Sequence, residues 1–261
     1  MQSDMSPEKP TVVLVPGSFS PASLYNTIIS QLPTHGYSAL AVSLPSVSRR
    51  PNAAPATLAE DAAHIHSVTT KLADEGKDTI LAVHSYGGIP GTESARDLAK
   101  ADRQTKGLAG GIVRLVYYAA FLPQQGQSLR DITGATPESV PMEDGYMIID
   151  EQLKALCAPL VYSDMPVEEG LEWFGKMKEH SSVGFDGKLT YQAYKYIPVT
   201  YLVCEDDKVI APELQRKMVE TARKQSTMDF EVVSCTAGHG VNVSKPEAII
   251  KAIEKAVSSG I

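Results

Sequence analysis

The sequence predicts an α/β fold, and three observations support this prediction. Short apolar segments that are rich in valine and isoleucine recur along the chain, as expected for strands that are covered on both faces. Amphipathic helical patterns separate these segments, and strands that alternate with helices form right-handed crossovers and a mostly parallel sheet. The chain has 261 residues, of which 43% are hydrophobic and 21% charged, so it can bury a large core.

Six apolar segments are the predicted strands, and three helical patterns stand out among them. The strands are 11–15, 38–42, 79–83, 112–120, 199–203 and 229–233. The helices are 57–75, 212–224 and 245–257, and the last carries Ile249, Ile250, Ile253 and Val257 on one apolar stripe. Ser244 and Glu247 have the spacing of a capping box at the start of this last helix, and Pro246 falls in its first turn.

The alternation breaks between the fourth and the fifth strand. Residues 122–196 are far longer than a direct crossover. Within them, residues 166–180 have the pattern of an amphipathic helix, with acidic residues early and basic residues late, which suits the helix macrodipole. We therefore expect a core formed by 1–121 and 197–261, with 122–196 inserted as a largely helical cap over the carboxyl edge of the sheet. A loose surface insertion is the alternative.

Charge, hydropathy and cysteine content exclude several classes of protein. The formal net charge is -7 and the longest basic cluster is Arg49-Arg50, so we expect neither a nucleic-acid partner nor an anionic membrane surface. The segment 1–10 lacks the apolar core of a signal peptide, and no window reaches the roughly 18 apolar residues of a membrane span, which favours a cytoplasmic location. The three cysteines lack metal-ligand spacing, so we expect reduced thiols and no metal site. They are Cys157, Cys204 and Cys235.

A serine at the end of the third predicted strand is the candidate nucleophile. Residues 81–91 have the sequence LAVHSYGGIPG, in which an apolar run ends at Ser85 and two glycines and a predicted helix follow. In a nucleophile elbow the serine occupies a strained turn, and small residues two before and two after it let strand and helix approach closely. Gly87 fits this pattern, whereas Val83 stands where glycine is usual. A serine that only caps a helix is the alternative.

A serine nucleophile needs a base and an acid that orients the base, and later loops supply both in the order that this type of site uses. His239 lies in a glycine-flanked loop after the sixth strand, at the sheet edge where the elbow also lies. Three acids follow the fifth strand, and chain geometry alone does not choose among Glu205, Asp206 and Asp207. We expect His84 to be structural. The other histidines are predicted to be surface residues, namely His35, His64, His66 and His180.

The loop after the first strand is predicted to complete an oxyanion hole. Gly17 lets the backbone turn sharply toward the nucleophile, so the N–H of Ser18 is one expected donor. The N–H of Tyr86, which directly follows the nucleophile at the start of a helix, is the other. A plain turn at Pro16-Gly17 is the alternative.

These motifs resemble those of the plant methylesterase and hydroxynitrile lyase family of α/β-hydrolases and its microbial relatives. LVPGSFSPASLY is similar to the opening loop of that family, HSYGG to its elbow, AAFLP to its junction with the cap, YLVCEDDKVIAPELQ to its acid loop and AGHGVNVSKPEAI to its histidine loop. The resemblance implies an α/β-hydrolase fold and covers nearly the whole core, whereas the cap matches only loosely. The acid of that family stands three residues after the small residue that ends the strand, here Cys204, so the resemblance implies Asp207.

Departures from the family pattern bear on the reaction. The lyase branch has a threonine in the oxyanion loop and a lysine directly after the histidine, where this chain has Gly17 and Gly240. Without that ammonium group a leaving cyanide lacks its positive partner. Pro16 replaces the histidine of the opening dipeptide, and Val83 replaces the glycine of the elbow. We therefore expect ester hydrolysis rather than lyase chemistry.

The sequence thus predicts a serine hydrolase of the carboxylesterase type that needs no cofactor. Ser85 is expected to attack a small apolar or aromatic ester, with His239 as base and Asp207 as the acid that orients it. The alternatives are lactone opening, carbon–carbon cleavage or cyclisation by the same triad, and a receptor without catalysis. The candidate substrate contacts are Phe19, in the loop after the first strand, and Trp173 and Tyr162, among the many aromatic residues of 122–196. The expected partner is a small molecule, and a homodimer is one option for assembly.

Overall fold

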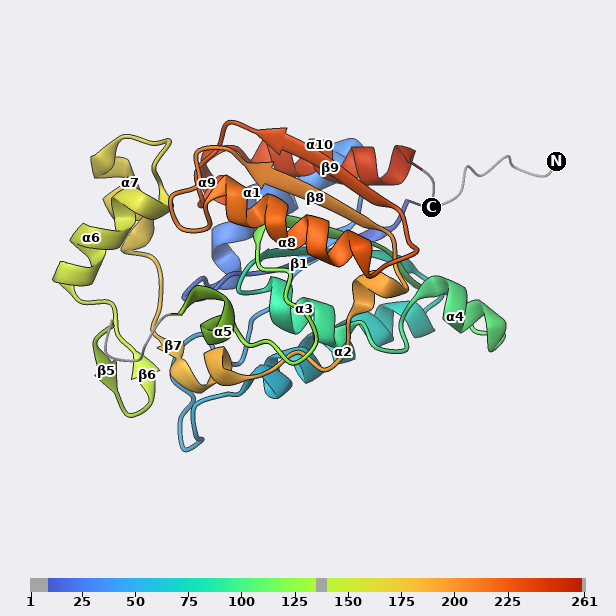
Figure 1. The fold of residues 1–261 in the computed structure, drawn as a ribbon, viewed down its shortest axis with the longest axis horizontal. Coiled ribbons are helices and arrows are strands. Elements are labelled where there is room, and N and C mark those ends of the chain that lie inside the picture. The colour runs from blue at the N-terminus through green and yellow to red at the C-terminus, as the bar shows by residue number, and fades with distance from the viewer. Residues whose placement is uncertain (1–8, 135–139, 260–261) are drawn as a thin grey trace.

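A parallel sheet forms the centre of the molecule. The computed structural model describes residues 9–134 and 140–259. The segment 1–10, for which no signal peptide is predicted, therefore lies almost entirely outside the described residues. Every neighbouring pair in the six-stranded sheet is parallel, with the order β2-β1-β3-β4-β8-β9 (Figure 1). The strands are β1 (Thr11–Val15), β2 (Ala39–Ala41), β3 (Asp78–Ser85), β4 (Gly111–Ala120), β8 (Val199–Cys204) and β9 (Phe230–Cys235). All six predicted strands are confirmed.

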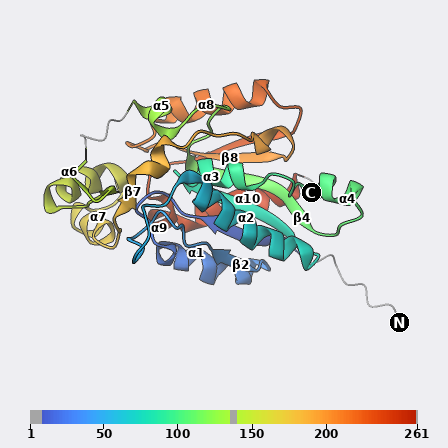
Figure 2. The same cartoon turned by 90° about the horizontal axis from the view of Figure 1, so that it is seen from below.

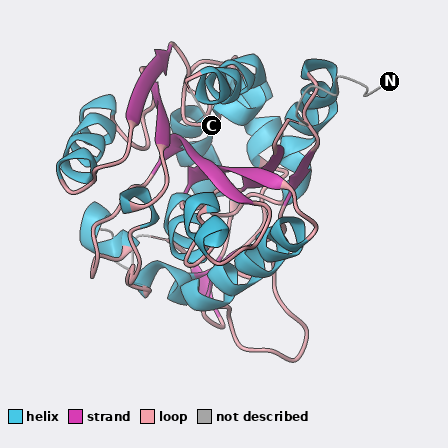
Figure 3. Ribbon diagram, turned by 90° about the vertical axis from the view of Figure 1, so that its right-hand side faces the viewer, coloured by secondary structure: helices cyan, strands magenta, loops and turns pink. Residues whose placement is uncertain are grey.

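Helices cover both faces of this sheet (Figure 3). The α-helices of the described residues are α1 (Asn26–Gln31), α2 (Leu58–Asp74), α3 (Gly88–Ser94), α4 (Lys100–Thr105), α5 (Leu129–Thr133), α6 (Glu151–Val161), α7 (Val167–Phe174), α8 (Pro212–Lys224), α9 (Val241–Ser244) and α10 (Pro246–Ser258). Short 3-10 helices lie at Ala22–Tyr25, Leu32–His35, Ser182–Asp186 and Ala193–Lys195. Among the described residues, no helix has the length and apolar character needed to cross a membrane.

The core consists of two apolar layers, because successive side chains of a strand point to opposite faces. Val13 and Val15 of β1 belong to the layer that α2, α3 and α8 cover. Val12 and Leu14 belong to the layer that α1 and α10 cover. Figure 2 shows α8 and α1 on opposite sides of the sheet. The inner strands β1, β3, β4 and β8 are buried on both faces and largely apolar, which made them recognisable in the sequence, whereas the edge strand β9 alternates between less and more exposed residues.

The start of α10 differs from the prediction. Ser244 is the last residue of α9 and Lys245 is the N-cap of α10, which has no capping hydrogen bond from a side chain. The Ser244 hydroxyl is buried and lacks a partner among the described residues. The predicted Ser244–Glu247 capping box is therefore wrong, because the preceding residues continue as a short helix. A capping box does form at α2, where Thr57 and Glu60 satisfy each other's backbone N–H groups.

Residues 122–196 contain α5, α6, α7 and a small antiparallel sheet. The sheet consists of β5 (Met142–Glu143), β6 (Tyr146–Met147) and β7 (His180–Ser181), in that order. Helices α6 and α7 pack side by side at one end of the molecule, next to the carboxyl ends of β8 and β9 (Figure 1). Two of the hydrogen bonds between 122–196 and the core lie at this end: the N–H of Gly240 donates to the carbonyl of Val161 at 2.7 Å, and Ser163 Oγ donates to the carbonyl of Asp206 at 2.7 Å.

The helix predicted at 166–180 is shorter than expected. It ends at Phe174, and the chain continues into β7. Hydrogen bonds to distant parts of the chain override the helical pattern here, because the N–H of Lys178 donates to the carbonyl of Phe19 at 2.8 Å. His180 follows in β7 and is 0% exposed, so its prediction as a surface residue is wrong.

Candidate active site

Ser85 occupies a strained turn between β3 and α3. It is the last residue of β3, its φ angle is 50° and its side chain is almost completely buried. A positive φ is unfavourable for a residue with a side chain, and it persists only where surrounding contacts hold it. The N–H of Phe121 donates to the carbonyl of Ser85 at 3.1 Å, which ties the turn to the end of β4. The turn therefore presents the hydroxyl at the carboxyl edge of the sheet.

Glycines make this close approach of strand and helix feasible. A Cβ at Gly87 would overlap the carbonyl oxygen of Pro16. Val83 stands where glycine is usual, and a glycine in α3 makes room for its side chain. A Cβ at Gly91 would lie 2.6 Å from Val83 Cγ1, so the glycine in α3 provides the space that Val83 fills.

The structure brings together the serine, the histidine and one of the three candidate acids. Ser85 Oγ lies 3.0 Å from Nε2 of His239, and Nδ1 of His239 lies 2.9 Å from Oδ2 of Asp207. These residues come from the ends of β3, β9 and β8, which share one edge of the sheet. A carboxylate only accepts hydrogen bonds, so Nδ1 carries the proton and Nε2 accepts from the serine hydroxyl. The contacts give the order hydroxyl, imidazole, carboxylate that nucleophilic catalysis by serine requires.

Asp207 is held by several donors. Its Oδ1 accepts from the N–H groups of Val209 and Ile210, each at 2.8 Å, and Oδ2 also accepts from Nε2 of Gln215 at 3.1 Å. Burial alone would raise the pKa of Asp207, but the His239 imidazole and the two backbone N–H groups outweigh it, and the pKa lies below its ordinary value. The carboxyl group is therefore ionised at neutral pH.

The two neighbouring acids lie elsewhere. Asp206 is exposed, and Glu205 forms an ion pair of 2.5 Å with Arg216. Neither has a contact with His239 among the described residues. The geometry thus agrees with the choice of Asp207 that the resemblance implied.

Gln215 was not identified from the sequence. It is completely buried on α8, and besides Asp207 it donates to the carbonyl of Ile210 at 2.7 Å and accepts from the N–H of Cys204 at 3.2 Å. It thus ties the end of β8 to the acid loop. A signal was present, because Gln215 stands on the same face of α8 as the buried Met218, Val219 and Ala222.

His84 braces two loops of the site. Its Nε2 lies 2.9 Å from the carbonyl oxygen of His239, which can only accept, so Nε2 carries the proton. Its Nδ1 therefore accepts from the Tyr25 hydroxyl at 2.8 Å, and that hydroxyl in turn accepts from the N–H of Gly17 at 3.1 Å. Burial lowers the pKa of His84 to about 3, so the imidazole is neutral. This chain links the loop after β1 to the histidine loop.

The predicted oxyanion donors lie on the two sides of the serine. Gly17 approaches so closely that an added Cβ would lie 3.0 Å from Ser85 Cβ, which explains the glycine before Ser18. In the part of the chain that the structure describes, the N–H groups of Ser18 and Tyr86 have no hydrogen-bond partner. The fold thus leaves both N–H groups unused; Ser18 lines the cavity, whereas Tyr86 is buried and is not part of the lining.

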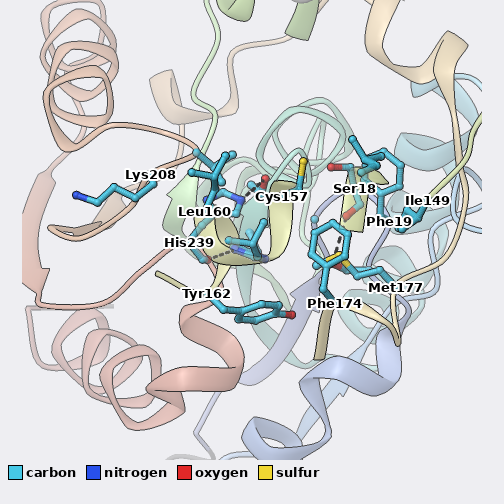
Figure 4. A pocket seen from close by; sticks show the side chains of 18 of the residues that line it. Ser18, Phe19, Ile149, Cys157, Leu160, Tyr162, Phe174, Met177, Lys208 and His239 are labelled. Atoms are coloured by element: carbon cyan, nitrogen blue, oxygen red, sulfur yellow. Dashed lines mark hydrogen bonds between the residues drawn. The ribbon is translucent and has the colours of Figure 1, made fainter. Parts of the chain in front are cut away.

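A largely apolar cavity of about 420 Å³ opens beside Ser85 and His239. Figure 4 shows Phe19 and Tyr162, two of the predicted contacts, together with Cys157 of α6, in its wall. The third predicted contact is wrong, because Trp173 does not line the cavity and its ring packs against Nζ of Lys176. Further apolar lining from 122–196 comes from Ile149, Leu153, Leu160, Phe174, Met177 and Phe185.

No group of three or more side chains within the described residues could hold a metal ion. The three cysteines are free thiols. Cys204 is buried at the end of β8, as expected for a small strand-end residue, whereas Cys157 lines the cavity.

Comparisons with known proteins identify the family and the fold of the chain. A model of the alpha/beta hydrolase family matches residues 12–252. The probable hydrolase R7 of Phoma sp. is 34% identical over 243 residues, which cover 92% of this chain and 95% of that protein. The alpha/beta hydrolase nvfD of Aspergillus novofumigatus is 30% identical over 262 residues, which cover 97% and 98%. Among solved structures, the methylesterase MES16 from Arabidopsis has a TM-score of 0.68 at 16% identity, over 96% of this chain and 100% of that one. At this identity the similarity to MES16 concerns the fold alone. MES16 is a methylesterase from a plant, the group of proteins that the sequence motifs resemble.

Proposed function

Because the chain belongs to the alpha/beta hydrolase family, we propose that it is a serine esterase in which Ser85 is the nucleophile, His239 the base and Asp207 the acid that orients it. One observation carries this proposal. The 3.0 Å contact between Ser85 and His239 and the 2.9 Å contact between His239 and Asp207 form a continuous relay at a cavity wall.

The proposed first half-reaction acylates the serine. Ser85 Oγ attacks the ester carbonyl carbon while its proton moves to Nε2 of His239, and the carbonyl oxygen becomes an oxyanion. The N–H groups of Ser18 and Tyr86 would stabilise that charge, and one such donor typically contributes about 10²–10³ in kcat. The carbon–oxygen bond to the alcohol then breaks, and the leaving alcohol takes the proton from His239.

In the second half-reaction, water releases the acid. His239 removes a proton from a water molecule that attacks the acyl carbon, and the bond to Ser85 Oγ breaks as the serine regains its proton. Throughout, ionised Asp207 would hold the proton of Nδ1 in place and stabilise the imidazolium. Its lowered pKa supports this role.

The cavity supports a neutral substrate with an apolar body. Among the described residues that line the cavity, Lys208 is the only lysine or arginine; it is exposed, and Figure 4 shows its side chain extending away from the other labelled residues. The Tyr162 hydroxyl has no hydrogen-bond partner in the described part of the chain, so it is available to one polar group of the substrate. We further propose that 122–196 acts as a cap, since its side chains form much of the cavity wall.

Hydrolysis of p-nitrophenyl esters of increasing acyl length tests this function. We expect turnover that is better with longer or aromatic acyl groups than with acetate, and a loss of about 10⁴-fold or more in kcat for Ser85→Ala. Ser94→Ala is the matched control, because Ser94 is a buried serine of α3 that does not line the cavity. No turnover by the wild-type chain with any ester would contradict the proposal and favour a receptor, whereas turnover of lactones alone would favour ring opening.

A further inference from the structure

His180 lies between the two loops that supply the proposed oxyanion donors. Its imidazole has ring-centroid distances of 5.4 Å to Phe19, which directly follows Ser18, and 5.0 Å to Tyr86, the other donor residue. It is 0% exposed and does not line the cavity. Resting on the esterase function above, we propose that His180 is a positioning residue that holds the two oxyanion donors at their working separation.

The first anchor is the backbone of Phe19. Its N–H donates to Nδ1 of His180 at 3.4 Å, and its carbonyl accepts from the N–H of Lys178 at 2.8 Å. Phe19 has a φ of 62°, in the left-handed region that a phenylalanine avoids unless other contacts compensate. His180 and Lys178 thus hold the N–H and the carbonyl of Phe19, which compensates for its unfavourable backbone conformation.

The second anchor is the ring of Tyr86. The His180 imidazole meets it edge-on, with an interplanar angle of 79°. On the other side, the Tyr86 hydroxyl donates to Oδ2 of the buried Asp61 at 2.8 Å, and Oδ1 of Asp61 accepts from the N–H of Ser46 at 2.9 Å. Phe185 packs against both rings, at 5.2 Å from His180 and 5.4 Å from Tyr86. These contacts fix the position of the Tyr86 ring. His180 contacts both this ring and the backbone of Phe19, so it sets the distance between the two residues.

The protonation state of His180 suits this role. Because Nδ1 accepts from Phe19, the proton of the neutral imidazole is on Nε2, which has no hydrogen-bond partner among the described residues. Burial lowers the pKa of His180 to about 3, so Nδ1 remains an acceptor at neutral pH. A substitution that tests the proposal must therefore either keep or remove the hydrogen-bond acceptor at the position of Nδ1.

Two amide substitutions distinguish the effect of a hydrogen-bond acceptor at the Nδ1 position from the effect of having any polar side chain at residue 180. In His180→Asn the amide oxygen can take the position of Nδ1, whereas in His180→Gln it reaches the position of Nε2. We expect kcat for a p-nitrophenyl ester to fall about 10- to 100-fold in His180→Gln, the range for a displaced catalytic group, and clearly less in His180→Asn. KM should change by less than about threefold in both, because the substrate body contacts the cavity wall.

Inhibition by an aryl trifluoromethyl ketone provides the second readout. This compound adds to the serine and leaves an oxyanion, so its inhibition constant should rise in parallel with the loss of kcat/KM across the variants. A purely structural role would lower the melting temperature without this parallel. His64→Gln, at an exposed position of α2, is the control and should keep wild-type values.

Four outcomes decide the proposal. The proposal is supported if kcat/KM and the affinity for the ketone fall in parallel, and if kcat is higher in His180→Asn than in His180→Gln. Equal kcat for the two variants, or a full loss of kcat with unchanged ketone affinity, would overturn it. If the wild-type chain itself fails to hydrolyse esters, the esterase function has failed, and this result is distinguishable because it appears before any substitution at His180.

Discussion

Two regions meet at the cavity, and different forces shape them. The triad edge, formed by the end of β3 with His84 and Ser85 and by the loops after β8 and β9, is held by hydrogen bonds: Asp207 alone accepts from Val209, Ile210, Gln215 and His239. The cavity wall from 122–196 is held by packing of apolar side chains. Hydrogen bonds are directional and fix single atoms, whereas apolar contacts fix volume and tolerate exchange. We infer that the triad edge determines the reaction and the wall determines the substrate.

Helix α6 illustrates the second region. Leu153, Cys157 and Leu160 follow helical spacing and line the cavity, while Leu156 on another side of the helix is 65% exposed. One face of this short helix therefore contributes to the wall. Substitutions on this face should change which ester is preferred, and substitutions at the triad edge should change the rate for every ester.

The largest effect is expected from the acid of the triad edge. Asp207→Asn should lower kcat by at least about 10², because the wrong tautomer of His239 becomes populated and the imidazolium loses its carboxylate. Asp206→Asn should change kcat by less than about tenfold, since Asp206 is exposed and the described residues show no hydrogen bond or ion pair between it and His239. Both variants are measured on one activated ester, and thermal melts verify that they are folded. A crippled Asp206 variant beside an active Asp207 variant would refute this assignment of the acid.

The same contrast explains what could be predicted from the sequence. The six strands and the residues Ser85 and His239 were predictable because apolar strands alternate with helices, and strand ends in a parallel sheet share one edge. The family pattern then indicated Asp207. His180 was mispredicted because its burial depends on β7 pairing with β6 and on contact with Phe19, which lies 161 positions away in the sequence. Such distant contacts leave no periodic signal in a single sequence.

The packing of the elbow predicts an effect on stability. Gly91→Ala should destabilise the protein by about 1–3 kcal/mol, because the new methyl group would overlap Val83 Cγ1. In a Val83→Ala background the same substitution should be neutral or stabilising, since alanine is favoured over glycine in a helix. A double-mutant cycle from denaturant unfolding measures this coupling. Additive effects would show that Gly91 does not compensate for Val83.

Acid stability compares one buried histidine from each region. His84 belongs to the triad edge and His180 to 122–196, and burial lowers the pKa of each to about 3. Between about pH 6.5 and 3 the unfolded chain binds these two protons and the folded chain does not, so stability falls as the pH is lowered. At pH 5 each of these two histidines should lower the free energy of unfolding by about 2 kcal/mol. His180→Asn should roughly halve this pH dependence between pH 7 and 5, measured by urea unfolding. An unchanged slope would contradict the neutral state of His180.

The smallest effect is expected at the cavity wall. Tyr162→Phe removes the hydroxyl and should lower kcat/KM roughly 2- to 10-fold for esters that carry a hydrogen-bonding group, the range for one such bond. It should leave simple alkyl esters unaffected. Tyr196→Phe, at a tyrosine that is 47% exposed and does not line the cavity, is the control. Equal losses for both classes of ester would mean that Tyr162 supports the site rather than selects the substrate.

Labelling with a fluorophosphonate tests the central claim most directly. This reagent forms a stable bond with an activated serine, and mass spectrometry of the intact chain and its peptides locates the adduct. We predict a single adduct on Ser85, none in Ser85→Ala, and labelling at least about 10²-fold slower in His239→Ala, because the base activates the hydroxyl. No adduct on the folded wild-type chain, or an adduct on another residue, would contradict the account.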